Sequence, residues 1–246
     1  EMLSQFRTHL RSRVKMLALV FAIGFVATFP LTRTFIAWLI EPQRLPSDVE
    51  IIVITPVEFI LLQVRLAAHV GLMCMVVVFL SEGSWKASKH FAVRQRLAEL
   101  DFKTPRPNMT MLMTFVSALT LMVAGIYYSW NWLTPMLLEY LTTDAQSAGL
   151  STEWRLTSYI GFIANLALAS AVGFQAPLVT LAVLRLGLVR RATVRSYLRH
   201  IWCSALILGS FLSPPDPLSL FLVAMPVVIL FEIAIVIDAI TRKEVL

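Results

Sequence analysis

Hydrophobic residues gather in six runs that are separated by short polar or basic segments. The runs cover about residues 14–30, 57–80, 109–130, 157–184, 198–212 and 218–238. Apolar stretches of this length predict helices that cross a membrane. No repeat, linker or low-complexity tract separates them. We therefore expect an all-α polytopic membrane protein of six transmembrane helices, folded as a single membrane domain over residues 1–246.

The last two runs predict shorter helices than the other four. A helix over residues 197–212 would be about 24 Å long, whereas the hydrocarbon core of a bilayer is about 30 Å thick. The sixth run is interrupted by Pro226 and carries Glu232, so its uninterrupted apolar length is also short. We expect these two helices to thin the bilayer locally or to pack against longer helices that do span it.

The turn between these two runs is rich in proline. Pro214, Pro215 and Pro217 have no backbone N–H, and each disfavours helix in the residue before it. Asp216 can accept hydrogen bonds from the first N–H groups of the following helix. The segment therefore predicts a stiff, capped turn with few unsatisfied donors near the membrane surface.

Composition and charge support a membrane location and set its orientation. Hydrophobic residues make up 58% of the 246 residues, charged residues make up 15%, and the mean hydropathy is +0.76. The net charge of +6 comes from basic residues between the apolar runs, where they set topology and contact lipid headgroups, so nucleic acid is not an expected partner. Sixteen of the flanking Lys and Arg residues fall on one predicted side and three on the other. Both termini are therefore predicted to face the cytoplasm, or the matrix or stroma of an organelle.

Several polar side chains lie at membrane depth, where an unpaired charge costs several kcal/mol. Glu58 and Arg65 share one helix face but are two turns apart, so they cannot touch directly. Glu58 lies near the outer surface and can stay hydrated, while Arg65 needs a partner or a route to the surface. Gln175 either repairs a kink at the nearby Pro177 or faces a partner helix. These residues are expected to face a partner helix or a cavity, as are Asn165 and Glu232.

Catalytic chemistry is not indicated. The two cysteines and four histidines do not have the spacing of a metal site. Neither a Ser/His pair nor paired aspartates occur at membrane depth, and the glycine-rich phosphate-binding motifs are absent from the sequence. We therefore expect neither an enzyme nor a cofactor.

The order of several motifs resembles TatC, the six-span subunit of the twin-arginine protein translocase. The resemblance covers nearly the whole chain, and its most specific part runs from the Pro-Pro-Asp turn to a Phe-Glu pair. The matching positions in this last third are Phe174, Gln175, Pro177, Pro214, Pro215, Asp216, Ala224, Pro226, Phe231 and Glu232. Earlier matches are Pro42, Thr55, Pro56, Glu58, Arg65, Tyr128 and Pro135.

Two departures from the TatC pattern affect the expected binding site. In the family, one carboxylate near the amino end and one in the first inner loop receive the arginine pair of a signal peptide. Here Gln5 stands at the first position, two residues before Arg7, and the loop pattern is largely lost. Glu82 or Glu99 are the candidates for the second carboxylate.

The resemblance implies a concave six-helix bundle that binds signal peptides of folded precursors. It also implies assembly with single-span TatA/TatB-type subunits, with export driven by the proton-motive force. The alternative is a TatC-derived structural subunit of a larger membrane complex that does not recognise signals. The membrane would be a bacterial or archaeal plasma membrane or a mitochondrial inner membrane.

Overall fold

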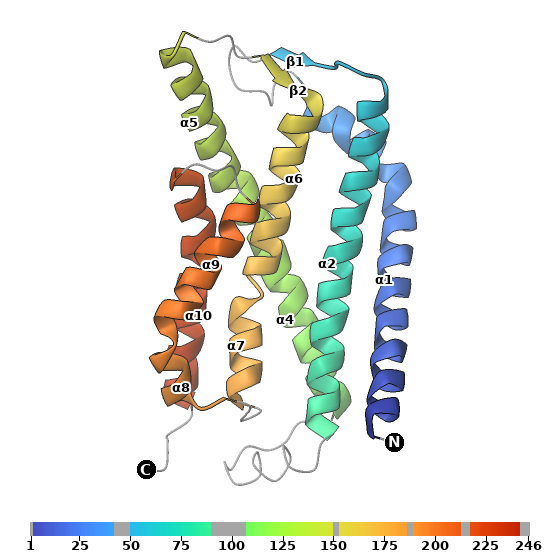
Figure 1. Ribbon diagram of the computed structural model, residues 1–246, viewed down its shortest axis with the longest axis vertical. Helices are drawn as coiled ribbons and strands as arrows, with labels where there is room; N and C mark the ends of the chain where they lie inside the picture. The colour runs from blue at the N-terminus through green and yellow to red at the C-terminus, as the bar shows by residue number, and fades with distance from the viewer. Residues whose placement is uncertain are drawn as a thin grey trace. The chain divides into compact units, whose positions relative to one another are not determined.

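The protein is described by a computed structural model that covers residues 2–41, 50–89, 107–149, 153–185, 189–212 and 217–241. Nearly all of these residues are helical (Figure 1). The helices are α1 (Met2–Leu39), α2 (Val57–Lys89), α4 (Pro107–Tyr128), the π-helix η2 (Ser129–Leu133), α5 (Thr134–Ser147), α6 (Leu156–Gly173), α7 (Ala176–Arg185), α8 (Arg191–Ser196), α9 (Leu198–Leu212) and α10 (Pro217–Thr241). The two strands are β1 (Glu50–Ile52) and β2 (Glu153–Arg155).

The predicted runs lie within these helices, but α1 continues past the predicted end at residue 30, through Pro30 to Leu39. Five helical segments are long and apolar enough to cross a membrane, namely Val14–Leu39, Val57–Gly83, Met111–Ser147, Leu156–Arg185 and Pro217–Thr241. The all-α membrane fold is therefore confirmed. Helix α9 has 15 residues and is short, as expected. The count of six spans and the side on which the termini lie stay predictions.

Two compact units divide the chain. The first unit comprises residues Glu1–Phe79 and Thr134–Asn165, and the second comprises Leu80–Leu133 and Leu166–Leu246. Each unit has its own buried residues. The expectation of a single membrane domain stays a prediction.

In the first unit, a short parallel strand pair brings the beginnings of two helices together. Ile52 of β1 lies opposite Arg155 of β2. Strand β1 precedes α2 and strand β2 leads directly into α6, as Figure 1 shows. Helices α1 and α2 also approach closely, because a Cβ atom on Gly24 would lie 3.1 Å from the Cα atom of Gly71. Glycine therefore allows the two backbones to come into contact there.

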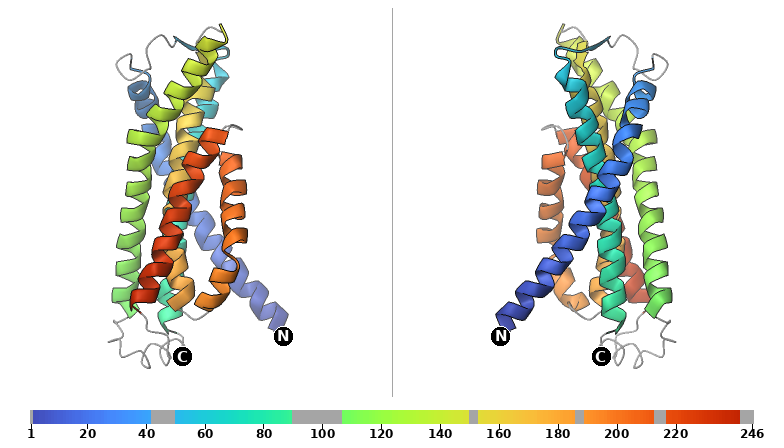
Figure 2. Two further views of the ribbon diagram at one scale, coloured as in Figure 1. Left: turned by 90° about the vertical axis from the view of Figure 1, so that its left-hand side faces the viewer. Right: turned by 90° about the vertical axis from the view of Figure 1, so that its right-hand side faces the viewer.

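In the second unit, α9 and α10 run antiparallel side by side (Figure 2). Helix α10 also packs along α7. One buried cluster joins α7, α8 and α10 through Leu184, Val194, Phe231 and Ile235. Leu198 and Ile201 of α9 pack against this cluster. The cluster therefore holds both short helices, α8 and α9, against α10.

Helix α10 differs from the expectation of a short, interrupted sixth helix. It continues through Pro226 and has 25 residues, which is enough to cross a bilayer. A proline inside a helix leaves the carbonyl four residues earlier without its N–H donor. Here that carbonyl belongs to Leu222, and the hydroxyl of Tyr128 donates to it. A side chain of α4 thus replaces the missing backbone donor.

The third apolar segment is also longer than the predicted run of 109–130. Helical structure continues through a π-helical turn at Ser129–Leu133 and then through α5 to Ser147. Pro135 is the second residue of α5, where its missing N–H is tolerated at the start of a new helix. Within the turn, the side-chain amide of Asn131 donates to the carbonyl of Tyr127. The side chain therefore helps to satisfy the backbone where the helix widens.

Candidate functional site

Glu58 lies at the start of α2, where sequence analysis expected a hydrated carboxylate. Its side chain is instead 8% exposed, and its Oε1 atom lies 2.9 Å from the Nε atom of Arg155. The strand pair holds Arg155 in this position, because it is the last residue of β2. The carboxylate of Glu58 can be buried because Arg155 supplies the opposite charge. The sequence pattern did not predict this partner. The charge of Glu58 is therefore matched within the first unit.

Arg65 lies two turns further along α2 and forms a polar cluster with His69 and Asn165. The Nη2 atom of Arg65 donates to Oδ1 of Asn165 at 3.1 Å. The Nε2 atom of His69 lies 3.0 Å from the same oxygen, and its Nδ1 atom lies 2.6 Å from the backbone carbonyl of Arg65. The side chain of Arg65 is exposed, and those of His69 and Asn165 are half-buried. The partner that sequence analysis required for Arg65 is thus an amide oxygen on α6.

Gln175 lies at the break between α6 and α7 and is 3% exposed. Its backbone N–H bonds to the carbonyl of Val172, which leaves the carbonyl of Ala171 without that donor. The side-chain Nε2 of Gln175 lies 3.3 Å from the Ala171 carbonyl oxygen and 3.0 Å from that of Ala118 on α4, and it donates to both. These contacts match the kink-repair interpretation, and they also join the break to a neighbouring helix.

Glu232 is half-buried on α10, and its Oε1 atom accepts a hydrogen bond of 3.2 Å from Nε1 of Trp202 on α9. Trp202 is 46% exposed. An indole N–H is a donor only, so a carboxylate at membrane depth is a suitable acceptor for it. Sequence analysis identified Glu232 but not Trp202, whose partner is 30 residues away in the sequence.

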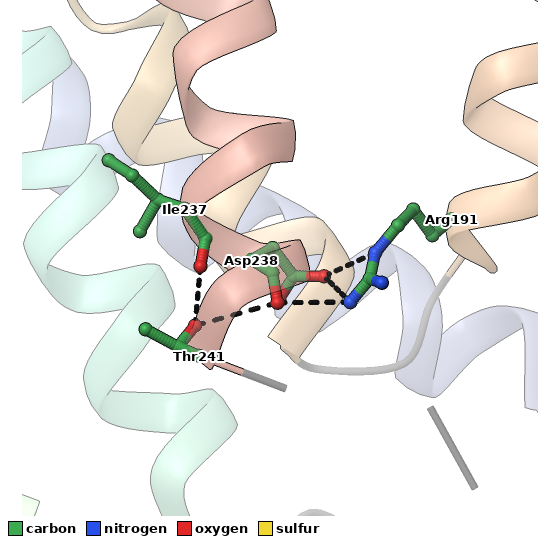
Figure 3. A network of polar contacts seen from close by, with 4 residues as sticks. All are labelled: Arg191, Ile237, Asp238 and Thr241. Carbon is green, nitrogen blue, oxygen red and sulfur yellow. Dashed lines mark hydrogen bonds and ion pairs between the residues drawn. The ribbon is translucent and has the colours of Figure 1, made fainter. Parts of the chain in front are cut away.

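The strongest polar contact in the second unit was not predicted from the sequence. Figure 3 shows the guanidinium of Arg191, the first residue of α8, beside Asp238 near the end of α10. Nε and Nη2 of Arg191 donate to Oδ2 of Asp238 at 3.1 and 2.9 Å, and Nη2 also donates to its backbone carbonyl at 2.9 Å. The side chains are 10% and 2% exposed. The available signal was an aspartate at the end of the sixth apolar run, with several arginines before the fifth run.

The residues expected to contact a signal peptide are only partly described. Gln5 and Arg7 lie on α1, but their side chains are outside the described part, as is Glu99 entirely. Glu82 lies on α2, seven residues before the helix ends, and is half-buried. The turn residues Pro214, Pro215 and Asp216 also lie outside the described residues. No arrangement of these candidates into one site can therefore be described.

Comparisons with known proteins identify the family. The family model described as Sec-independent protein translocase protein (TatC) matches residues 5–226. The TatC protein of Listeria innocua is 25% identical over 238 residues, which cover 96% of this chain and 90% of that protein. The TatCy protein of Bacillus subtilis is 23% identical over 235 residues, covering 93% and 85%.

Solved structures confirm the fold. A crystal structure of the twin-arginine translocase receptor TatC superposes with a TM-score of 0.75 at 20% identity, over 94% of this chain and 97% of that one. A second crystal structure of the receptor, in the detergent DDM, gives a TM-score of 0.74 at 21% identity.

Together these matches support a non-enzymatic subunit of a protein translocase. They do not favour the alternative of a structural subunit in a respiratory complex, and they do not support a mitochondrial location. The apolar helices agree with an integral membrane protein of the kind found in bacterial or archaeal plasma membranes. The chain belongs to the TatC family of Sec-independent protein translocase proteins.

Proposed function

We propose that this TatC-family subunit binds the signal peptides of folded precursors and assembles with single-span TatA/TatB-type subunits. Export would draw on the proton-motive force and would not need a nucleotide. The observation that carries the proposal is the family match over residues 5–226, which includes the amino-terminal helix and the first inner loop. Both are the regions in which the family receives its signal peptide.

Signal binding would use residues at the amino end of α1 and the end of α2. Gln5 offers one neutral acceptor oxygen in place of a carboxylate, so its contact with an arginine pair would be weak. Glu82 is the described carboxylate nearest to the inner loop. Glu99, further along that loop, is the other candidate. Recognition would therefore depend more on the apolar part of the signal peptide than the family pattern implies.

Assembly would use the face formed by α9 and α10. A helix of 15 residues is about 22 Å long and cannot match a hydrocarbon core of about 30 Å. Lipid beside such a short helix must thin, which costs free energy. A single-span helix packed beside α9 would replace that lipid and avoid the cost. Exposed aromatic residues on both helices, Trp202 and Phe221, supply apolar surface for such a contact.

An export assay tests the proposal. The chain is expressed with TatA/TatB-type subunits in a host that lacks its own TatC, together with a folded fluorescent reporter that carries a twin-arginine signal. We expect the reporter to reach the outer compartment, and we expect export to stop when the proton-motive force is dissipated. The control is the same reporter with two lysines in place of the arginines. Insertion of the chain without any export would contradict the proposal.

A further inference from the structure

The guanidinium of Arg65 has no carboxylate partner among the residues that the structure describes. The nearest acid on the same helix face, Glu58, is already paired with Arg155. Of the five N–H donors of Arg65, the described residues accept only the one bond from Nη2 to Asn165. A cation at membrane depth with one neutral acceptor is incompletely compensated. Among the described residues the cluster therefore lacks an anion, and one could come from another chain.

His69 completes the polar cluster around Asn165. Arginine can only donate, so the atom of Asn165 that faces it must be the amide oxygen. The Nε2 atom of His69 faces the same oxygen, and its Nδ1 atom faces the carbonyl oxygen of Arg65. Which ring nitrogen donates depends on the tautomer, and either way His69 adds an N–H donor to the cluster.

The backbone of α6 leaves room for the guanidinium. A Cβ atom on Gly161 would lie 2.7 Å from Nη1 of Arg65, so the arginine occupies space that any other residue would fill. Gly161 and Asn165 are one turn apart on α6, and together they position the guanidinium between a bare backbone and an amide. The group is therefore held in a defined place while its side chain stays exposed.

The depth of the cluster decides between two sources of an anion. The span Val57–Gly83 has 27 residues, and His69 lies near its middle. Asn165 binds Arg65 and His69 through one oxygen, so the guanidinium lies beside a residue near the middle of the span. The hydrocarbon core ends about 15 Å from the bilayer midplane, and lipid phosphates lie beyond that boundary. A carboxylate on a neighbouring helix can lie at the required depth.

We propose that Arg65, His69 and Asn165 form a binding site for a glutamate or aspartate carboxylate on a transmembrane helix of another chain. The guanidinium would bind the carboxylate through its unused donors, while Asn165 and His69 hold it in place. The inferred site is independent of signal-peptide binding, because it needs no arginine pair in the ligand. Export could fail in the assay above while this site still binds its helix.

The test uses a designed transmembrane peptide as the probe. The peptide has about 22 leucine and alanine residues with lysines at both ends and one glutamate at the depth of Arg65. A matched peptide carries glutamine instead. Energy transfer between dyes on the peptide and on the purified full chain measures binding in phosphatidylcholine nanodiscs. We expect the chain to bind the glutamate peptide about tenfold more tightly or better, because a charge-assisted pair replaces a neutral one.

Variants of the chain locate the preference. Arg65→Gln should abolish it, and Arg65→Lys should keep part of it. Asn165→Asp supplies an internal carboxylate and should also abolish it, although Arg65 remains. Arg33→Gln, which removes another exposed arginine within a candidate span, is the matched control and should keep it. Thermal unfolding of each variant in detergent shows that a loss of preference is not a loss of fold.

Three outcomes would overturn the proposal. The first is equal binding of the two peptides by the unaltered chain. The second is a preference that survives Arg65→Gln. The third is a preference that disappears when phosphatidylglycerol replaces phosphatidylcholine, together with retention of that lipid that depends on Arg65 in native mass spectrometry. The third outcome would assign the cluster to a lipid phosphate.

Discussion

The hydroxyl of Tyr128 on α4 donates a hydrogen bond of 3.2 Å to the carbonyl oxygen of Leu222 on α10. This carbonyl lies four residues before Pro226, which has no N–H to offer it. The ring of Tyr128 also lies beside Phe174, with ring centroids 5.6 Å apart. One side chain thus supports α10 at its proline and contacts the segment between α6 and α7.

Tyr128→Phe is expected to lower the free energy of unfolding by about 1 kcal/mol, because the Leu222 carbonyl loses its donor while the ring stays. Unfolding in detergent, followed by circular dichroism, measures the loss. In a Pro226→Ala background the helix supplies its own N–H, so the same substitution should cost clearly less. An equal cost in both backgrounds would show that the hydroxyl does not compensate for the proline.

Arg191→Gln is expected to destabilise the second unit by about 3 kcal/mol or more, because it leaves the buried carboxylate of Asp238 without its charge partner. Arg195→Gln is the matched control, since Arg195 lies on the same helix but is exposed. Unfolding free energies of both variants are compared. The double variant Arg191→Gln with Asp238→Asn should recover much of the loss, and failure to recover would argue against the pair as the cause.

Gln175→Leu is expected to destabilise the fold by about 1 to 3 kcal/mol, because two carbonyls at the α6–α7 break lose their donor. The subunit should still insert into membranes. If Gln175 also faces a partner helix, co-purification with TatA/TatB-type subunits should weaken more than the stability loss explains. Unchanged co-purification would leave kink repair as its role.

Cysteine labelling checks the predicted sidedness. In a background without Cys74 and Cys203, Gln95→Cys and Gln146→Cys should react with an impermeant maleimide from opposite sides of the membrane. The expectation follows from the uneven distribution of Lys and Arg between the loops. Labelling of both positions from one side would reject the six-span arrangement.

Gln5→Glu is expected to strengthen binding of a twin-arginine peptide by about tenfold at low salt, because a carboxylate forms charge-assisted bonds with guanidinium. Peptide binding to the purified chain is measured at low and high salt, and the gain should shrink as salt screens the charges. If neither form binds the peptide, signal recognition through this position is excluded.

The apolar pattern was enough to predict the helices, because spans are set by local hydrophobicity. It also identified Arg65, Asn165 and Glu232 as polar groups in an apolar setting. The length of α10 could not be predicted in this way. Its continuity depends on Tyr128, which is 94 residues from Leu222 in the sequence.

Two ion pairs were not predicted, because their partners are far apart in the sequence and meet only in the fold. Glu58 was expected to be hydrated because its partner, Arg155, enters the site only through the strand pair. Arg191 and Asp238 are 47 residues apart, and both resemble ordinary flanking charges when read locally. The expected contacts of Gln5 and Glu99 lie outside the described side chains, so they stay predictions.

The pairing of β1 with β2 also constrains the order in which the protein forms. Glu50 pairs with Glu153 in parallel register, so the ladder joins two segments that are separated in the sequence by α2, α4, η2 and α5. Ribosomes add about 5 to 20 residues per second, so β1 waits on the order of 5 to 20 s before β2 exists. The helices between them must enter the membrane first. The ion pair of Glu58 with Arg155, which depends on this ladder, therefore cannot form until the chain has passed Arg155, whereas Arg191 and Asp238 are synthesised later still.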